Sequence, residues 1–338
     1  MTKMLRWGIL GTSFISNTVA KAIAGSPGSC IEAVFGRDAA RLDAFADKHN
    51  ISKKYQTIEE ILDDSDVDVV YIGLPSHMHA SATIAAAKRG KPILSEKSLA
   101  TTMEDSKAMI EAVRQADVFF LEGLMYLSHP LMDKLAEIIR AGTLGRISGV
   151  SGYYAANIWR KANPEGMGTI YNLGCYPVSL LHFIMETAFG PDAFQARQVS
   201  GLGNVSTDGT VHVRDAALTV RFGNGVLGTI QSTDTFGNDF GFVIQGDKAS
   251  LRFKTNPWLP VVGDNIIEIK PYGGSIEEIV VRTELDAFSS QVKRVEDCLI
   301  ASLKEAQRPS PSWSNSVEIM GLLTEWEADI KRNNKEIQ

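Results

Sequence analysis

A short stretch near the N-terminus reads Gly8-Ile9-Leu10-Gly11-Thr12-Ser13-Phe14-Ile15-Ser16, and it joins an apolar run to the start of a helical pattern. From here to Leu121, short apolar runs alternate with helical patterns. Several of these runs are apolar on both faces, which is typical of parallel strands covered on both sides. The alternation therefore predicts βαβ units and a doubly wound parallel sheet, an α/β fold of the Rossmann type.

The individual elements follow from these patterns. The predicted strands of this first part are Trp7–Leu10, Ile31–Phe35, Val67–Leu74, Pro92–Leu94 and Val118–Leu121. The predicted helices are Asn17–Ala24, Ala39–His49, Ile58–Leu62, His79–Arg89 and Met103–Ala116.

The rhythm changes after about residue 125, where helices Leu131–Arg140 and Leu173–Thr187 flank a first strand. A hairpin is expected from Ala216–Phe222, a turn at Gly223–Gly225 and Val226–Thr233. We therefore expect residues 126–338 to form an α+β domain with an open, mostly antiparallel sheet, following a cofactor-binding domain over residues 1–125. The remaining predicted elements are strands Gly241–Gln245, Ser250–Phe253, Ile266–Ile269 and Glu277–Val281 and helices Phe288–Ala301 and Ser316–Lys331, the last a candidate for packing on the first domain.

Composition narrows the class of protein. The 338 residues are 44% hydrophobic and 22% charged, with a formal net charge of −6, which is ordinary for a globular protein and offers no basic surface for nucleic acid. No apolar stretch is long enough to span a membrane. The first strand starts by Met4, so we expect no signal sequence. Three scattered cysteines indicate free thiols in a reducing compartment, which predicts a cytoplasmic location.

The opening turn is a candidate dinucleotide site. Of the three glycines in the G-x-G-x-x-G fingerprint only Gly11 is kept, and Ser13 and Ser16 stand at the other two positions. The free N–H groups of a helix N-terminus still suit a phosphate group. An ordinary strand-to-helix turn is the alternative, and the surrounding βαβ pattern favours the cofactor site.

The end of the second predicted strand bears on the choice of dinucleotide. Gly36 stands where NAD sites usually place an acid, and Arg37 follows it. Because a guanidinium binds a 2′-phosphate well, we expect NADP(H) to be preferred, with NAD(H) as the alternative cofactor. The other interpretation is that Arg37 is solvated and Asp38 caps the next helix.

The most informative residue is Lys97, which follows the strand in Lys91-Pro92-Ile93-Leu94-Ser95-Glu96-Lys97. Ligands of open α/β sheets bind at the carboxyl ends of the strands. An ammonium group at that place must be paired with an anion, exposed to solvent or engaged in binding or catalysis.

Three blocks together resemble the Gfo/Idh/MocA family of oxidoreductases. They are the opening turn, the segments Leu74–His79 and Gly90–Ser98, and Gly166–Pro177. The third block and the segment Glu122–Pro130 are most similar to the branch of dimeric dihydrodiol dehydrogenase and related NADP-linked sugar and ketone reductases. The resemblance implies a nicotinamide-dependent oxidoreductase with a Rossmann domain, a substrate domain whose sheet serves oligomerisation, and hence a homodimer or higher homo-oligomer.

The resemblance also implies site residues. The family's Glu-Lys pair maps to Glu96 and Lys97, and its D-x-G-x-H/Y element maps to Asn172, Gly174 and Tyr176. Ser98 replaces the customary proline, so we expect a trans bond after Lys97. Asn172 replaces a common aspartate, and Ser76 and Leu127-Ser128 also depart from the family's pattern near the expected substrate. The full set of expected cofactor residues is Gly11, Thr12, Ser13, Phe14, Ile15, Gly36, Arg37, Leu74, Pro75, His79, Glu96 and Lys97.

Hydride transfer between a carbinol carbon and a nicotinamide requires a group that exchanges a proton with the oxygen. We expect Tyr176 to exchange this proton while Lys97 polarises the oxygen, with the reverse assignment open. A packed aromatic residue is the alternative for Tyr176. The expected substrate residues are Tyr126, His129, Trp159, Arg160 and Asn172. His77 and His79 lie on different sides of a helix, so no metal site is predicted.

The leading functional hypothesis is an NADP(H)-dependent dehydrogenase or reductase acting on a sugar, cyclic polyol or related carbonyl compound. A nicotinamide-dependent glycosidase that retains its cofactor is one alternative. A non-catalytic dinucleotide-binding regulator is another, because a Rossmann fold does not fix function.

Overall fold

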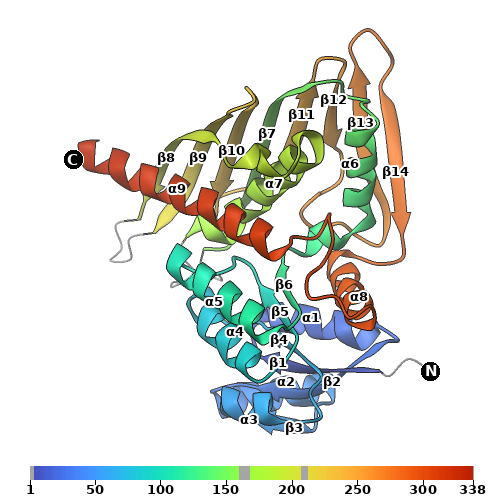
Figure 1. Cartoon of the computed structure of the whole chain (residues 1–338), viewed down its shortest axis with the longest axis vertical. Coiled ribbons are helices and arrows are strands. Elements are labelled where there is room, and N and C mark those ends of the chain that lie inside the picture. The colour runs from blue at the N-terminus through green and yellow to red at the C-terminus, as the bar shows by residue number, and fades with distance from the viewer. Residues whose placement is uncertain (1–3, 160–167, 207–211, 338) are drawn as a thin grey trace. The chain divides into compact units, whose positions relative to one another are not determined.

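The computed structural model describes residues 4–159, 168–206 and 212–337. The chain divides into two compact units (Figure 1). The first unit combines the chain up to Ser128 with Ala287–Val317, and the second combines His129–Asp286 with the chain from Glu318 onward. A late segment thus belongs to the first unit, whereas the predicted division had one boundary, after residue 125. The functional roles expected of the two parts stay predictions.

The first unit is built on a six-stranded sheet in the order β3-β2-β1-β4-β5-β6. All its pairings are parallel, which confirms the predicted doubly wound sheet. This order is the one found in dinucleotide-binding folds. The strands are β1 Leu5–Leu10, β2 Ser29–Phe35, β3 Lys53–Tyr55, β4 Val69–Ile72, β5 Ile93–Glu96 and β6 Phe120–Gly123.

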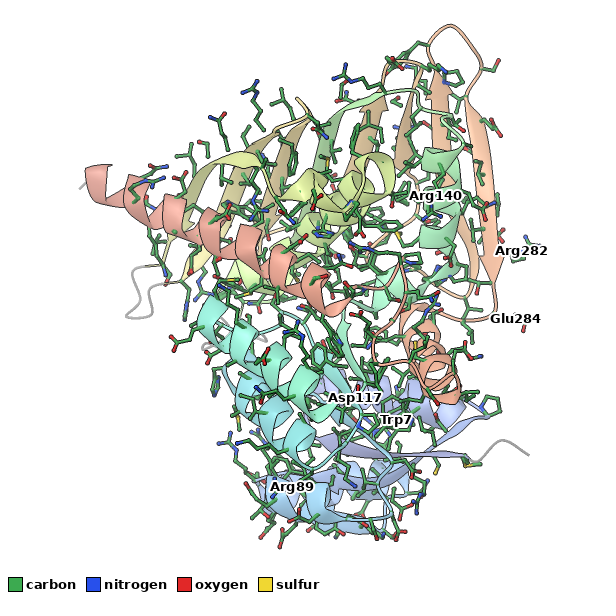
Figure 2. The ribbon with its side chains drawn as sticks, viewed as in Figure 1. Trp7, Arg89, Asp117, Arg140, Arg282 and Glu284 are labelled. Carbon is green, nitrogen blue, oxygen red and sulfur yellow. The ribbon has the colours of Figure 1, made fainter. Side chains whose placement is uncertain are left out.

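Helices cover both faces of this sheet, which explains why central strands such as β4 are apolar on both faces. One core cluster contains Trp7 and Ile9, and the other contains Leu10 and Ile72. Trp7, labelled in Figure 2, is fully buried, and its Nε1 donates to Ser29 Oγ at 2.9 Å. The helices are α1 Phe14–Gly25, α2 Ala39–His49, α3 Ile58–Asp63, α4 His79–Lys88, α5 Met103–Ala116 and, from the late segment, α8 Ala287–Ile300.

The second unit contains an eight-stranded sheet in the order β14-β13-β12-β11-β7-β10-β9-β8. β7 and β10 pair in parallel and the other neighbours are antiparallel, so the predicted open, mostly antiparallel sheet is confirmed. The predicted hairpin is β9 with β10, and Gly225 in its turn has a φ of +92°. The strands are β7 Ile147–Ala156, β8 Arg197–Val205, β9 Val213–Phe222, β10 Leu227–Thr233, β11 Asn238–Gly246, β12 Ala249–Phe253, β13 Gly263–Pro271 and β14 Glu277–Thr283.

Helices cover one face of this second sheet (Figure 1). They are α6 Pro130–Arg140, α7 Cys175–Phe189 and the part of α9 Trp313–Ile337 that belongs to the unit. Trp326 of α9 is fully buried, and its Nε1 donates to the Ala217 carbonyl at 3.0 Å. A Cβ at Gly201 would lie 2.8 Å from the Trp326 ring, so a glycine allows the helix to approach the strand closely. Within the described residues, no helix has both the length and the apolar composition needed to cross a membrane.

Candidate functional site

Several of the predicted cofactor residues lie at one edge of the first sheet. Ile72 of β4 is level with Leu10 of β1 and with Ser95 of β5. The turn after Leu10, the loop after Ile72 and Lys97 therefore all follow the carboxyl ends of neighbouring parallel strands. This is the edge where open α/β sheets bind ligands.

The turn after β1 has the geometry that a close-packed phosphate loop requires. Gly11 has a φ of +107°, and a Cβ there would come within 2.9 Å of the Gly73 carbonyl oxygen. Ser13 caps α1 by accepting a hydrogen bond of 3.2 Å from the Ser16 backbone N–H. Phe14, in the first turn of the helix, is 86% exposed. The cofactor contacts of this turn, including those of Thr12 and Ile15, stay predictions.

Ser16 occupies the third glycine position of the fingerprint because the opposite residue leaves room for it. Ser16 is fully buried, and its Oγ contacts the Gly73 carbonyl at 3.4 Å. A Cβ at Gly73 would lie only 2.3 Å from Ser16 Oγ. Residue 73 has no side chain, and the Ser16 side chain occupies the space beside it.

After β2 the chain makes a tight turn at Gly36, and the next residue, Arg37, is an exposed cation. The Gly36 N–H donates to the Tyr55 carbonyl at 3.1 Å. Asp38 caps α2 by accepting a 2.9 Å hydrogen bond from the Arg41 N–H, as the other interpretation of this segment predicted. Arg37 is exposed, and its contact with a 2′-phosphate stays a prediction.

Lys97 lies directly after β5 and is half-buried, whereas Glu96 at the end of the strand is buried. Burial raises the pKa of Glu96, and the positive charge of Lys97 and a hydrogen bond from Tyr71 oppose the rise. The Lys97–Ser98 peptide bond is cis, so the trans bond expected from the missing proline is wrong. A serine lacks the ring that favours the cis isomer but does not exclude it.

His79 joins two loops of this edge. It is 1% exposed, and its Nδ1 and Nε2 each lie 2.9 Å from a carbonyl oxygen, of Ser98 and of Leu74 respectively. Burial lowers the pKa of His79. A neutral imidazole can donate to only one of the two carbonyls. His79 therefore supports the loops that carry Pro75 and Lys97, and its predicted contact with the cofactor stays untested.

Glu122, for which no role was predicted, lies in β6 and is 3% exposed. Burial raises the pKa of Glu122 to about 7, with Ser316 and the charge of Lys97 acting in the opposite direction and Glu96 reinforcing the rise. Two buried carboxyl groups thus lie near Lys97. The signal in the sequence that could have identified Glu122 was a carboxylic acid inside an otherwise apolar strand.

In the second unit, Tyr176 lies in the first turn of α7, after a turn of π-helix over Ile170–Gly174. The predicted helix start at Leu173 is therefore two residues early. Tyr176 is 7% exposed and packs edge-on against Tyr154, with ring centroids 5.4 Å apart. The centroid of the Trp258 ring lies 6.2 Å from that of the Tyr176 ring. Tyr176 is thus held by an aromatic cluster, and its role as proton donor stays a prediction.

Asn172, in the π-helical turn, lies beside a carboxyl group that sequence reasoning missed. Asp234 follows β10 and is fully buried. Burial raises its pKa to about 6, with the charge of Arg214 and the Asn172 side chain acting in the opposite direction. The Arg214 guanidinium lies over the Trp159 ring, 5.0 Å from its centroid. Asn172 and Trp159 are therefore close to one buried acid, whereas Arg160 lies outside the described residues.

Two other predicted substrate residues are fully buried, Tyr126 in the first unit and His129 in the second. The Nδ1 atom of His129 caps α6 by accepting a 3.1 Å hydrogen bond from the Leu131 N–H, so a neutral ring carries its proton on Nε2. Burial lowers the pKa of His129. This geometry gives His129 a structural role, and contact with substrate stays a prediction for both residues.

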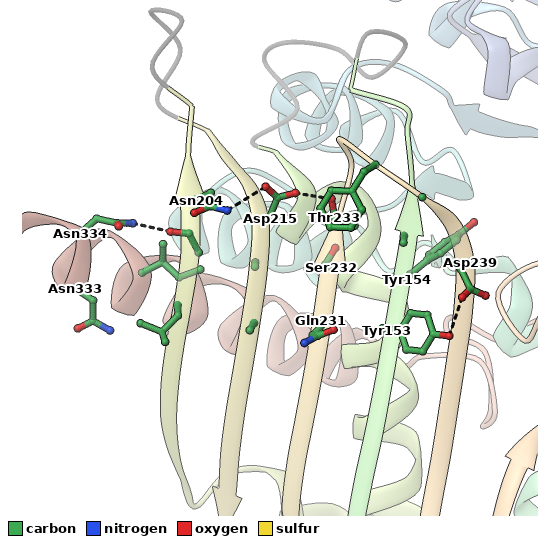
Figure 3. Close-up of a pocket in the computed structure, with 18 residues that line it drawn as sticks. Tyr153, Tyr154, Asn204, Asp215, Gln231, Ser232, Thr233, Asp239, Asn333 and Asn334 are labelled. Atoms are coloured by element: carbon green, nitrogen blue, oxygen red, sulfur yellow. Dashed lines mark hydrogen bonds between the residues drawn. The ribbon is translucent and has the colours of Figure 1, made fainter. Parts of the chain in front are cut away.

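A hollow of about 760 Å³ lies in the second unit, against β7, β8, β9 and β10 (Figure 3). Asp215 in its lining accepts hydrogen bonds from the hydroxyls of Thr233 and Thr235 at 2.5 and 2.6 Å. Although burial acts in the opposite direction, these bonds hold the pKa of Asp215 below its ordinary value. None of the predicted site residues is among the described residues that line this hollow.

Comparison with known proteins identifies the family. Residues 5–124 match the family model described as an oxidoreductase family with an NAD-binding Rossmann fold, and residues 132–252 match the GFO/IDH/MocA C-terminal domain. A 1,5-anhydro-D-fructose reductase from Ensifer adhaerens is 29% identical over 80% of this chain and 79% of its own. A trans-1,2-dihydrobenzene-1,2-diol dehydrogenase from Bos taurus is 27% identical over 89% and 90% of the two chains.

A solved 3-ketoreductase from Actinomadura kijaniata, in complex with TDP-benzene and NADP, has the same fold. It superposes with a TM-score of 0.83 at 18% identity and covers 97% of this chain and 98% of its own. The two family models, taken with a parallel sheet in the first unit and a mixed sheet in the second, show that this chain belongs to the GFO/IDH/MocA family of NAD-binding oxidoreductases.

Proposed function

We propose that this chain is an NADP(H)-preferring dehydrogenase or reductase that interconverts a carbinol and a carbonyl group on a sugar, a cyclic polyol or a related small molecule. The observation that carries the proposal is the position of Lys97, on the same sheet edge as the positive-φ turn at Gly11. The names of the relatives support the substrate class, because they include a reductase of an anhydro sugar and a dehydrogenase of a cyclic diol.

In this proposal the residues at the carboxyl edge of the first sheet would hold the nicotinamide cofactor, whose chemistry would be hydride transfer to or from the substrate carbon. Tyr176 exchanges the matching proton with the substrate oxygen, and Lys97 stabilises the negative charge that develops on that oxygen. Glu96, held by Tyr71, orients Lys97. Structures of the Actinomadura kijaniata ketoreductase include one with a lysine replaced and one with a tyrosine replaced, the two residue types invoked here.

The cofactor preference rests on the residues after β2. Gly36 offers no carboxylate to a ribose 2′-hydroxyl, and the exposed Arg37 offers a guanidinium to a 2′-phosphate. We propose NADP(H) as the preferred cofactor for this reason, with NAD(H) accepted more weakly.

The test is a substrate panel assayed with NADPH and with NADH. It contains 1,5-anhydro-D-fructose, aldoses, ketoses, inositols and dicarbonyl compounds. A stoichiometric change in nicotinamide absorbance with at least one of them is expected. Release of a glycosidic leaving group without net cofactor change, or no turnover across the panel, would contradict the proposal.

We further propose that the chain forms a homo-oligomer in the cytoplasm. Leu202 and Leu227 are 61% and 51% exposed on the sheet face opposite the helices, and burial of such side chains favours association. All three cysteines are described and free, as expected in a reducing compartment. Light scattering should give a mass above that of one chain for the wild type, and a lower mass for Leu227→Glu. A monomeric wild type would contradict the proposed assembly.

A further inference from the structure

Asp234 is a fully buried acid that the proposed mechanism does not use. Its Oδ1 lies 3.9 Å from Nη1 of Arg214, and the Asn172 side chain interacts with the same carboxyl group. Among the described residues, neither carboxyl oxygen has a partner at ordinary hydrogen-bond distance and angle, so both interactions are long or poorly aligned. A buried carboxylate held this loosely is costly unless its charge is used.

The backbone of Asp234 connects the acid to the segment before the undescribed residues. Its carbonyl accepts hydrogen bonds of 3.0 Å from the N–H groups of Ile158 and Trp159, and its own N–H donates to the Arg214 carbonyl at 3.2 Å. The Arg214 guanidinium covers the Trp159 ring. Movement of Arg214 toward or away from the carboxyl group would therefore change the surroundings of the Trp159 indole.

The charged groups around Asp234 are of opposite sign. Arg214 of β9 favours the ionised acid, and the neighbouring Asp215 disfavours it. Asn172 is uncharged, and its side-chain N–H groups bind a carboxylate more strongly than a neutral acid. Ionisation should consequently draw both Arg214 and Asn172 toward Asp234, and protonation should release them.

We propose that Asp234 is a positioning residue whose charge sets the placement of Trp159 and Asn172, two residues expected to line the substrate site. The substrate part of this inference rests on the proposed function. The placement of Trp159 does not, so the two can be tested separately.

The first test follows tryptophan fluorescence from pH 5 to pH 8 in the wild type, Trp159→Phe, Asp234→Asn and the control Asp239→Asn. Asp239 is an exposed acid of β11 that accepts a 3.1 Å hydrogen bond from Tyr153, so the control removes a comparable charge elsewhere in the same sheet. For each protein, subtracting the signal of the same protein with Trp159→Phe added isolates the indole of Trp159. That signal should titrate in the wild type near the pKa of Asp234, about 6. It should titrate equally in Asp239→Asn and stay flat in Asp234→Asn.

A Trp159 signal that is flat in the wild type, or that still titrates in Asp234→Asn, would overturn the positioning role whether or not a substrate is known. The asparagine variant keeps the size of the side chain, so a folding defect is not the expected outcome. If Asp234→Asn does not fold, Arg214→Met takes its place. Because Arg214 carries the effect of the charge to the Trp159 ring, its removal should flatten the Trp159 titration, and an unchanged titration would contradict the proposal.

The second test measures KM and kcat with NADPH and 1,5-anhydro-D-fructose, or with the best substrate of the panel, across the same pH range. Because Asn172 and Trp159 are expected to hold the substrate, the wild-type KM should rise at least about threefold as the pH falls below 6, with a smaller change in kcat. Asp234→Asn should show a KM that is independent of pH. If the Trp159 signal titrates but no panel compound reacts, the proposed function fails and the positioning of Trp159 stands. If substrates react, but KM changes neither with pH nor in Asp234→Asn, the substrate part of the inference fails.

Discussion

Tyr71 Oη donates a 2.9 Å hydrogen bond to Oε1 of Glu96, and both residues are buried in the first unit. Tyr71 belongs to β4, and Glu96 ends β5, one residue before Lys97. The bond thus links the central strands to the residue that precedes the proposed catalytic lysine. It also supplies a buried carboxyl group with a donor, which such a group requires.

Replacing Tyr71 by phenylalanine should leave the Glu96 carboxyl group buried without this donor. We expect a loss of about 1 to 3 kcal/mol in the free energy of unfolding, measured in urea. Tyr55→Phe is the matched control, because Tyr55 donates a 3.0 Å bond to Asp64 at a half-buried site. Equal losses in the two variants would argue against a special requirement at Glu96.

Lys97→Met and Tyr176→Phe should each lower kcat by about 10² to 10⁴, the usual range for a group that moves a proton or stabilises developing charge. The double variant should lose less than the product of the two effects if both groups act on one oxygen. Binding of NADPH should survive in Tyr176→Phe, as measured by fluorescence titration. Lys88→Met, at an exposed lysine of α4, controls for loss of charge. Turnover within a fewfold of wild type in both single variants would remove the mechanism.

Arg37→Asp should reverse the cofactor preference. Loss of a charge-assisted hydrogen bond to the 2′-phosphate weakens NADPH binding by about tenfold to a hundredfold, and a carboxylate there also repels the phosphate. The quantity to measure is the ratio of kcat/KM for NADPH to that for NADH. Arg41→Asp, which alters a nearby exposed arginine, should change this ratio little. A similar ratio in wild type and Arg37→Asp would contradict the assignment.

Glu122 should make the protein less stable as the pH rises. Its pKa in the folded chain is about 7, raised by burial above the ordinary value of 4.5. The folded state therefore holds a proton that the unfolded state has lost between these two values, and stability falls across that range. The loss from this group is at most about 3 kcal/mol. Glu122→Gln should flatten the pH dependence of the unfolding free energy between pH 5 and pH 8, and the exposed Glu111→Gln should not. Parallel pH profiles in wild type and Glu122→Gln would refute the raised pKa.

The parts of the fold that were predicted correctly depend on local patterns. Strands buried on both faces have apolar sequences, and the bounds of α2 and α5 were obtained without error because polar caps mark their ends. β3 was missed because it is a three-residue edge strand with the sequence Lys-Lys-Tyr. β8 was missed because Gly201 and Gly203 interrupt its alternation. Gly201 is explained by the closeness of α9, and Gly203 by the closeness of both β9 and α9.

In the candidate site, too, features set by neighbours in sequence could be predicted, and features set by contacts between distant segments could not. Asp38 was recognised as a cap because a cap depends on neighbours in sequence. Asp234 was not recognised, because its burial and its nearness to Arg214 and Asn172 arise from packing among distant segments. The cis bond after Lys97 was also beyond local reasoning, which relied on the residue type alone.

The contact between Ser16 and Gly73 shows that the nucleotide fingerprint of this chain is divided between two places 57 residues apart. The first turn by itself contains only one of the three fingerprint glycines, Gly11. A serine at residue 16 meets a glycine at residue 73, so the turn and the loop pass each other at close range. Other chains with a serine at the third position should be inspected for a glycine after the fourth strand before their cofactor sites are dismissed.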